Sequence, residues 1–258
     1  MYRYETHMHT CQGSACGVST GAQQARFYKA MGYQGIFITD HFFGGNTAAP
    51  RAGRWKDRID CFCEGFEDAW NEGQRIGLDV FFGWEENFMG DEYLIYGLSK
   101  QFLLDHPDME RWSRREQYEH VHAAGGCVIQ AHPFRMRDYL KDIRICTRFT
   151  DGIEVANAGN TPAQDAYAAR YARAKGLYCT AGSDNHWSRE GMQLFGVGLT
   201  ERLTSPADFV RHVLARQPHA LLCPDDRFDA DPSAEPLLPA FVIGEDGQFS
   251  DLPLDWIG

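Results

Sequence analysis

The sequence predicts an α/β fold in which strands and helices alternate around a parallel sheet that closes into one barrel. Apolar runs of strand length alternate with helix-length segments about seven times, and this alternation is typical of parallel sheets. Polar residues follow the apolar runs and do not precede them. In such folds the carboxyl ends of the strands hold the functional site. The length of 258 residues fits one α/β barrel of about 250 residues better than two ordinary domains.

Each expected element has a local reason. The first strand, 2–5, is followed by a loop rich in Gly, Ser and Cys at 10–20. Ser19 or Thr20 can cap a helix at 23–31, because hydroxyl side chains accept hydrogen bonds from the first free amides of a helix. Short continuous apolar runs indicate buried strands. Further strands are expected at 35–39, 79–84, 93–97, 127–131, 152–155, 176–181 and 195–199, and further helices at 59–76, 111–124, 161–175 and 206–215.

One connection and the chain end stand apart from this alternation. The segment 42–56 contains Gly44, Gly45 and Pro50 and is too long for a routine connection, so we interpret it as a lid or a substrate loop. No repeat or linker divides the chain. We therefore expect a barrel at 1–225 and an irregular C-terminal tail at 226–258, packed on the barrel and holding one short hairpin.

The composition excludes several classes of function. A formal net charge of −11 disfavours binding to extended nucleic acid or to a membrane surface. No apolar run approaches the ~20 residues of a membrane span, and the first residues do not resemble a secretory leader. The eight cysteines are scattered without a CxxC pair, which favours reduced thiols over a disulfide framework. We expect a cytoplasmic protein, and the sequence does not indicate its oligomeric state.

Metal-binding residue types gather where predicted strands end. On extended backbone, residues i and i+2 point to the same side, so Asp184 and His186 can share one point in space. His7 and His9 have the same spacing. A lone histidine is more often structural, but five such strand ends on one rim predict a site for divalent metal. The five ends carry His7 and His9, Asp40 and His41, Glu85 and Glu86, His132, and Asp184 and His186.

The other five histidines are expected to be structural or solvated. His120 and His122 are also two residues apart, but on a predicted helix their side chains diverge by about 200° and cannot share a metal. His106 and His219 are expected in a loop and a turn, and His212 on the surface of a helix.

Five short motifs together resemble the PHP family, named for the polymerase and histidinol phosphatase domains. They occur in the family's order between residues 7 and 186, so the resemblance covers most of the chain. It implies a distorted (β/α)7 barrel of the TIM type and a cluster of two or three divalent metals that hydrolyses phosphate esters. The motifs are His7-Met8-His9-Thr10, Ile38-Thr39-Asp40-His41, Gly83-Trp84-Glu85, Ala131-His132-Pro133-Phe134 and Gly182-Ser183-Asp184-Asn185-His186.

The resemblance also implies which residues bind the metals. The metals would be Mn, Zn or Fe, with one ion firmly held and one or two held more weakly. Asp40 is expected to support a ligand or a loop instead of binding metal. The implied ligands are His7, His9, Glu85 and Asp184 for one metal, His41 and His186 for a second, and His132 with the shared Glu85 for a third.

Two positions depart from the family pattern. Many members have a further ligand where this chain has Ala15, and many have a histidine near the position of Leu94. The second and third metals would therefore each lose a protein ligand, and another group would have to replace it. The candidates are Cys11, Gln12, Ser14, Cys16, Asp91 or water.

The implied function is hydrolysis of a small phosphate ester, with a metal-bound hydroxide as the nucleophile. The expected substrate is a small phosphorylated metabolite or a nucleotide. His41, Asp184 and His186 are the implied catalytic residues, and the two histidines could instead hold a second metal. The planar fork of arginine suits phosphate, so the candidate phosphate-binding residues are Arg135, Arg51, Arg54 and Asn157.

Two other functions stay open. A metal-binding sensor or interaction module without catalysis would fit the missing ligands at Ala15 and Leu94. A metal-dependent amidohydrolase on a related barrel also begins with His-x-His, but that family usually needs a carboxylated lysine on a middle strand. No lysine stands at a predicted strand end here.

Overall fold

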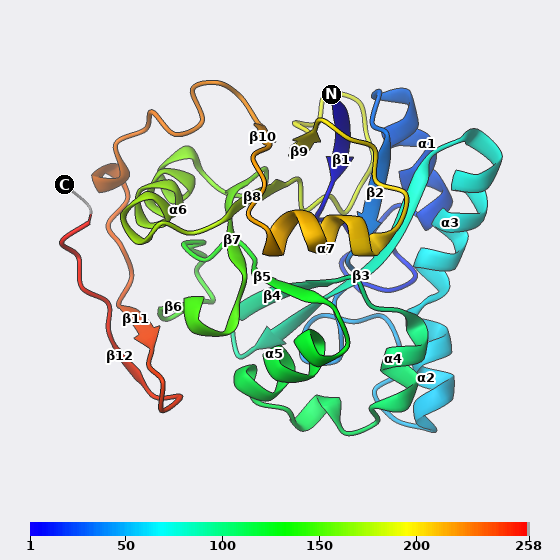
Figure 1. Ribbon diagram of the computed structural model, residues 1–258, viewed down its shortest axis with the longest axis horizontal. Coiled ribbons are helices and arrows are strands. Elements are labelled where there is room, and N and C mark those ends of the chain that lie inside the picture. The colour runs from blue at the N-terminus through cyan, green and yellow to red at the C-terminus, as the bar shows by residue number, and fades with distance from the viewer. Residues whose placement is uncertain (257–258) are drawn as a thin grey trace.

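A nine-stranded sheet forms the wall of a barrel in the computed structural model, which describes residues 1–256. The strand order is β10-β9-β1-β2-β3-β4-β5-β7-β8, and β8 also lies next to β9 and β10, so the sheet curls back on itself. Helices cover its outside (Figure 1). The structure thus confirms the predicted TIM-like barrel. The strands are β1 (Tyr2–Glu5), β2 (Gly35–Ile38), β3 (Asp79–Phe88), β4 (Asp91–Tyr96), β5 (Cys127–Gln130), β7 (Gly152–Asn157), β8 (Cys179–Gly182), β9 (Gly196–Leu199) and β10 (Ala220–Leu222).

The sheet is mixed, whereas the sequence predicted a parallel one. β1, β2 and β3 pair in parallel, as do β5, β7 and β8. β4 runs antiparallel to β3 and β5, and β9 runs antiparallel to β1 and β10. Only Met89 and Gly90 connect β3 to β4, with φ angles of 58° and 115°. A two-residue turn with positive φ joins antiparallel strands, so this connection forces the reversal.

β3 also extends beyond its predicted end at residue 84. It continues to Phe88 because β4 supplies a partner for each further residue, with Glu85 opposite Leu94 and Asn87 opposite Glu92. Directly opposite residues of an antiparallel pair face the same side of the sheet. Glu85 therefore lies within a strand, on the face that its partner in β4 also occupies.

Two helices, α1 and α6, begin where the sequence provides a capping residue. Thr20 caps α1 with a capping box that includes Gln23, and Thr161 caps α6. Gly176 ends α6 with a φ of 62°, as a left-handed helix end requires. The single helix expected at 59–76 is two helices, which meet at Cys63. The helices are α1 (Gly21–Ala30), α2 (Trp55–Phe62), α3 (Glu64–Ile76), α4 (Lys100–Asp105), α5 (Arg114–Ala123), α6 (Pro162–Lys175) and α7 (Pro206–Leu214), with 3-10 turns η1 (Met109–Arg111), η2 (Thr147–Phe149) and η3 (Pro232–Ala234).

Aromatic side chains fill the barrel. Tyr4, Phe37, Phe81 and Tyr96 come from four neighbouring strands and belong to one buried cluster. Phe209 of α7 joins them, with its ring centroid 4.8 Å from that of Phe37 and 5.1 Å from that of Tyr96. Because strands from around the sheet meet in this cluster, the barrel interior is packed. A ligand must therefore bind at a rim, not inside.

The first and eighth strands meet through the residues that follow them. Met8 and Asn185 form a parallel bridge, the amide of Asp184 donates to the carbonyl oxygen of His7 at 2.8 Å, and the amide of His9 donates to the carbonyl oxygen of Asn185 at 2.9 Å. We call this pairing the seam. It places the motif near the start of the chain beside the motif at 182–186.

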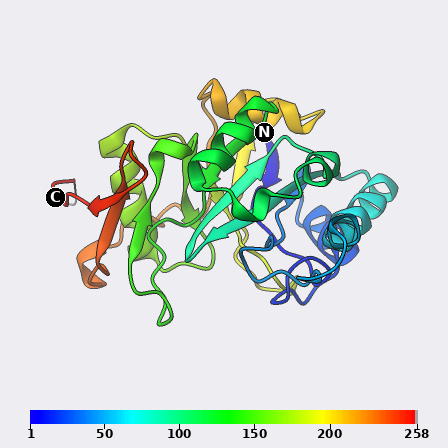
Figure 2. The ribbon, with the colours of Figure 1, turned by 90° about the horizontal axis from the view of Figure 1, so that it is seen from below.

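The C-terminal segment packs against one end of the molecule, away from α1, α2 and α3 (Figure 2). It holds one short hairpin, which pairs with β6. Trp256 lies within a cluster that includes Phe134 and Tyr167. The strands of this small sheet are β6 (Ile143–Ile145), β11 (Ala240–Ile243) and β12 (Phe249–Asp251).

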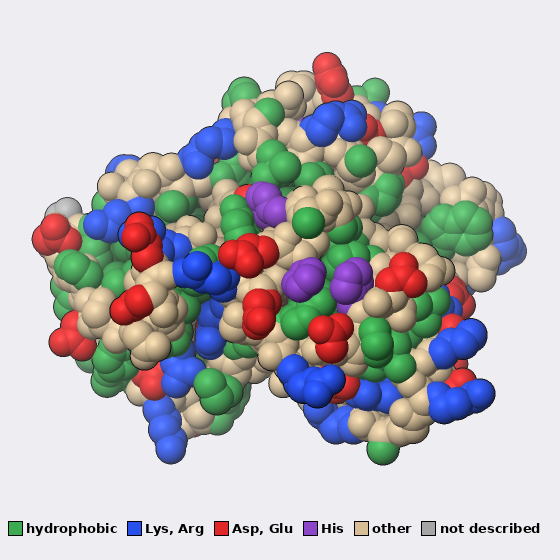
Figure 3. Space-filling model, turned by 60° about the horizontal axis from the view of Figure 1, so that its bottom comes forward, with side chains coloured by type: hydrophobic (Ala, Val, Ile, Leu, Met, Phe, Trp, Pro, Cys, Tyr) green, Lys and Arg blue, Asp and Glu red, His purple; other side chains and the backbone are tan. Residues whose placement is uncertain are grey.

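The remaining composition-based expectations can be compared with the described residues. None of the eight cysteines is paired in a disulfide bond. Among residues 1–256, no helix has the length and apolarity needed to cross a membrane. Acidic and basic side chains are interspersed over the face shown in Figure 3.

Candidate metal centre

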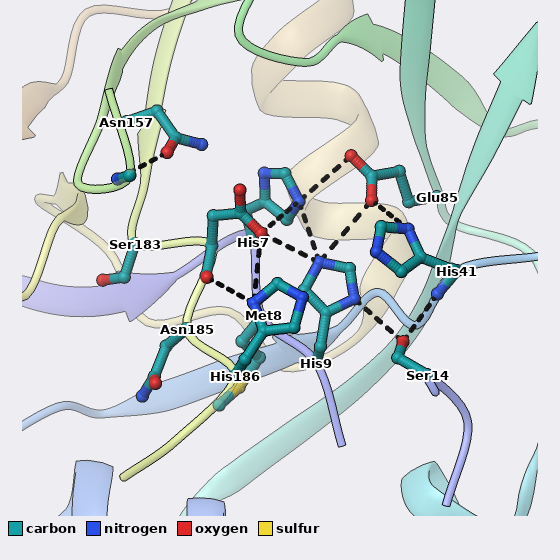
Figure 4. A network of polar contacts seen from close by, with 12 residues as sticks. His7, Met8, His9, Ser14, His41, Glu85, Asn157, Ser183, Asn185 and His186 are labelled. Atoms are coloured by element: carbon teal, nitrogen blue, oxygen red, sulfur yellow. Dashed lines mark hydrogen bonds and ion pairs between the residues drawn. The ribbon is translucent and has the colours of Figure 1, made fainter. Parts of the chain in front are cut away.

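Side chains from five places in the chain converge at the rim next to the seam. His7 Nε2 lies 3.2 Å from Glu85 Oε1 and 3.6 Å from Asp184 Oδ1. His9 Nε2 lies 3.1 Å from the same Asp184 oxygen and 3.3 Å from His7 Nε2. Figure 4 shows the imidazoles of His7, His9, His41 and His186 gathered together, with Glu85 at the side of this group next to His41. The structure therefore brings together the four residues expected to share one metal.

The remaining expected ligands surround this group. His41 Nδ1 lies 2.7 Å from Glu85 Oε2, and His132 Nε2 lies 3.3 Å from Glu85 Oε1, so one carboxylate faces both. Within the described chain, four groups of three residues place one donor atom each within 4.8 Å of one another. They are His9, His41 and His186; His7, Glu85 and His132; His7, His9 and Asp184; and His41, Glu85 and Glu92.

Two buried atoms show that this set of donors fits a cation. Glu85 Oε2 and His41 Nδ1 have no hydrogen-bond partner, although they are only 2.7 Å apart. Glu85 is fully buried and His41 is 9% exposed. A buried carboxylate oxygen without a partner costs free energy, and a divalent ion between the two atoms would satisfy both.

Two of the ligand residues have left-handed backbone. Asp184 has a φ of 52° and His132 a φ of 27°, a conformation that side chains other than glycine rarely adopt. Such strain concentrates at functional sites, where the surrounding structure imposes it. Here the seam holds Asp184, because its amide is bonded to the carbonyl oxygen of His7.

A ring of buried polar groups orients the ligands. Glu154 accepts from His7 Nδ1 at 3.1 Å and from the amide of His132 at 3.1 Å, so one carboxylate holds two ligands. Ser14 Oγ lies 3.0 Å from His9 Nδ1 and donates to Asp40 at 2.7 Å. Asp40 belongs to none of the four metal-binding groups in the described residues, in keeping with the supporting position expected for it. Such partners fix the ring orientation of metal-binding histidines.

The charges of these groups are strongly coupled. Burial would lower the pKa of His7, but the carboxylates of Glu154, Glu85 and Asp184 outweigh burial and raise this pKa well above its usual value. Burial would raise the pKa of Asp184, but Arg135 and His7 hold it well below its usual range. The carboxylate of Asp184 is therefore ionised at neutral pH, which is the form that binds a cation.

An open cavity of about 580 Å³ leads to these residues. Arg135 lines this cavity, and its Nη2 lies 2.7 Å from Asp184 Oδ2. Arg51 also lines the cavity, and its guanidinium donates to the carbonyl oxygens of Phe43 and Gly45 at 2.6 Å each. The long segment 42–56 thus contributes one wall, as expected for a substrate loop.

Two expected phosphate-binding residues lie elsewhere. Arg54 pairs with Asp57 on the surface, with its side chain 84% exposed, and does not line the cavity. Asn157 is fully buried; its Oδ1 accepts from Arg135 at 2.7 Å and its Nδ2 donates to Glu154 at 2.8 Å. These positions correct the sequence-based expectation: Arg54 is a surface residue and Asn157 supports Arg135 from behind.

Sequence reasoning missed Glu92, a residue of the centre. Glu92 Oε2 lies 3.4 Å from His132 Nε2, and Glu92 forms a metal-binding group with His41 and Glu85. Leu94 lies in the barrel core, so the alternation of β4 places Glu92 on the same inward face, and this alternation could have identified it. Cys16, one of the candidates for a replacement ligand, lines the cavity beside His41 and His186.

The other histidines lie away from the centre. His120 stacks on Trp112 with ring centroids 4.2 Å apart, and His122 Nε2 lies 2.9 Å from an oxygen of Asp151. His212 is 8% exposed and bonded to Gln217, which corrects the expectation that it lies on an exposed helix surface.

The chain matches no protein-family model, and no curated protein sequence matches it. Its fold is similar to several solved structures. A candidate metal-dependent phosphoesterase from Bifidobacterium adolescentis is 18% identical, over 83% of this chain and 96% of that protein, with a TM-score of 0.55. An amidohydrolase from Chromobacterium violaceum, solved with bound sulfate and no metal, is 17% identical over 87% of this chain and 99% of that protein, with a TM-score of 0.51.

A third structure carries the family name. It is a two-domain protein from Bacteroides vulgatus containing a predicted PHP-like metal-dependent phosphoesterase, 17% identical over 86% of this chain, with a TM-score of 0.59. This chain spans 64% of the length of that protein. Likenesses at this level of identity concern the fold. The chain therefore has the fold of the PHP-like metal-dependent phosphoesterases, as its five motifs predict.

Proposed function

We propose that this protein hydrolyses small phosphate monoesters with divalent metal bound at the cluster of histidines and carboxylates. The observation that carries the proposal is the position of Arg135, which lies 2.7 Å from the metal-binding residue Asp184 and lines the same cavity. A guanidinium next to a metal cluster can hold two oxygens of a phosphate while the metal contacts a third.

The residues of the chain have separate tasks in this proposal. Bound metal would neutralise phosphate oxygens and lower the pKa of a coordinated water toward 7. Arg135 orients the phosphate, and Asn157 and Asn160 hold the arginine through hydrogen bonds of 2.7 and 2.8 Å. His186 lies at the mouth of the cavity beside His41, and these two imidazoles would help to hold a second metal. His41 also faces Glu85.

The cavity favours a small substrate. Its volume of about 580 Å³ lies within the range of about 300–1,000 Å³ for small-molecule sites. Met89 and Tyr139, which are 82% and 76% exposed, lie along a neighbouring groove that shares Glu92 and Arg135 with the cavity. A phosphorylated metabolite or a nucleotide fits these dimensions; an extended polymer would meet a surface of net negative charge.

Metal removal and replacement test the proposal. Treatment with a chelator should abolish hydrolysis of p-nitrophenyl phosphate, and Mn²⁺, Zn²⁺ or Fe²⁺ should restore it. Asp184→Asn should lower kcat/KM by at least about 100-fold and reduce bound metal, because loss of even a supporting partner costs 10–100-fold. Arg54→Ala is the matched control and should change neither. Hydrolysis that survives complete metal removal would contradict the proposal.

Amide hydrolysis is the second candidate, since one protein of similar fold is named an amidohydrolase. No lysine is among the residues that line the cavity, so the described residues offer no bridging lysine of the kind that this chemistry usually needs. A panel of amide and phosphate substrates at equal metal loading distinguishes the two. Metal binding without turnover of any substrate would support the third possibility, a non-catalytic module.

A further inference from the structure

Three imidazoles form a separate group on the outer side of the cluster. His9, His41 and His186 place one nitrogen each within 4.8 Å of one another. Their rings are close, with centroids 4.2 Å apart for His9 and His41 and 4.2 Å for His9 and His186. Three nitrogens suit zinc or another borderline metal, but a tetrahedral site takes a fourth donor.

Cys16 offers a candidate fourth donor, a thiol at the wall of the same cavity. Its side chain lines the cavity together with His41 and His186. The preceding residue, Ala15, has no donor atom in its side chain. Cys11, in the same loop, instead approaches Gln12 Oε1 at 3.9 Å and is not among the cavity-lining residues.

Backbone hydrogen bonds fix this position on both sides. The amide of Ala15 donates to the carbonyl oxygen of Asn46 at 2.8 Å, and the amide of Val18 donates to the carbonyl oxygen of His186 at 2.8 Å. Cys16 is therefore held between two anchors, one of which is a member of the imidazole group. A ligand placed in this way loses little conformational freedom when it binds.

An independent observation shows that a cation belongs next to these groups. His41 is 9% exposed, and its Nδ1 faces the partnerless Oε2 of Glu85 without a hydrogen bond. A carboxylate oxygen and an imidazole nitrogen buried 2.7 Å apart in this way can both bind one divalent ion.

We propose that Cys16 binds, as a thiolate, the metal held by His9, His41 and His186. The S–H bond breaks, the proton passes to solvent, and a sulfur–metal bond forms without a change in oxidation state. A thiolate favours Zn²⁺ or Fe²⁺ over Mn²⁺ and Mg²⁺. Cys16 would therefore make one metal position of the cluster selective for Zn²⁺ or Fe²⁺. The inference rests on the metal cluster of the proposed function and does not depend on the substrate.

Cobalt spectroscopy tests the assignment directly. Metal-free protein, kept reduced, is titrated with Co²⁺, and absorption in the near ultraviolet reports charge transfer from thiolate to cobalt. The wild-type chain and Cys11→Ser should both show this band, and Cys16→Ser should lose it while keeping the weaker visible bands of a histidine site. Zn²⁺ affinity of the position should fall by more than about tenfold in Cys16→Ser, at least the effect of losing a supporting partner.

A chemical readout complements the spectrum. Bound Zn²⁺ should protect Cys16 from iodoacetamide, as peptide mass spectrometry shows, and should leave the labelling of Cys11 unchanged. Cobalt bound without the charge-transfer band, or Cys16 alkylated equally with and without zinc, would overturn the assignment. Metal-dependent phosphatase activity in that case would leave the proposed function standing, whereas failure to bind any metal would overturn both.

Discussion

Gly182 lies close to both His7 and Glu154. Adding a single methyl group at this position should therefore weaken metal binding. A Cβ at this position would lie 2.5 Å from Glu154 Oε1 and 2.5 Å from the Cβ of His7. Glu154 orients His7 through a hydrogen bond of 3.1 Å, so the methyl group would wedge between a ligand and the carboxylate that holds it.

The size of the effect follows from these distances. Ordinary van der Waals contact begins near 3.4 Å, so His7 or Glu154 must move by about 0.9 Å. Metal sites tolerate deviations of only about 0.2 Å in ligand distance. We expect Gly182→Ala to weaken metal binding by at least about 10–100-fold, the effect of losing a supporting partner. Overpacking should cost about 1–3 kcal/mol of folding free energy, or about 2–4 °C in Tm for each kcal/mol in a chain of this size.

Isothermal titration with Zn²⁺ and thermal unfolding of the metal-free protein measure the two effects separately. Gly244→Ala is the matched control: its new Cβ would meet Asp246 Oδ1 at 2.9 Å, an exposed side chain that can move away. Wild-type zinc affinity in Gly182→Ala, with Gly244→Ala unchanged as well, would refute the proposed coupling between Glu154 and His7.

Two further predictions concern residues that lie farther from the seam. Arg227→Ala should destabilise the protein by about 3–5 kcal/mol in urea unfolding. Asp165, which is paired with Arg227 at 2.7 Å and 1% exposed, would become a buried charge without a counter-charge. As a control, the exposed Lys175→Ala should change stability by less than about 0.5 kcal/mol. Glu92→Gln should lower the number of metal ions bound per chain, as elemental analysis measures it, without changing the folding stability. Full metal content in this variant would show that Glu92 is not a ligand.

The sequence predicted the features that depend on short-range pattern. Apolar runs and caps such as Thr20 and Thr161 set the elements, because periodicity and capping chemistry act within a few residues. The convergence of His7, His9 and Asp184 at one rim could also be predicted, since carboxyl ends of parallel strands meet at one edge. These inferences needed no knowledge of which strands are neighbours.

The features that sequence reasoning missed depend on contacts between distant segments. Asn157 follows an apolar run and so seemed to face the site, but Arg227 donates to its carbonyl oxygen at 2.8 Å, and the side chain is fully buried. Sequence reasoning missed Glu92 because the reversal of β4 depends on a turn at Met89 and Gly90. This pair of residues is a weaker sequence signal for a hairpin turn than Asn-Gly. In both cases a contact with a segment distant in the sequence determines where the side chain lies: Arg227 for Asn157, and the pairing of β4 with β3 for Glu92.

Closure of the barrel and assembly of the centre are one structural event. The carboxylate of Glu5, which is fully buried, accepts from the amides of His7 and Ser183 at 2.9 Å each, so it spans the seam just below the ligands. His9 on one side and Asp184 on the other complete a donor group across it. An ion bound there would join the first and eighth strands of the barrel, and no such arrangement exists in an unfolded chain. Metal binding must therefore increase the folding stability. The strained backbone of Asp184 persists because the seam on one side and the ion on the other both hold it in place.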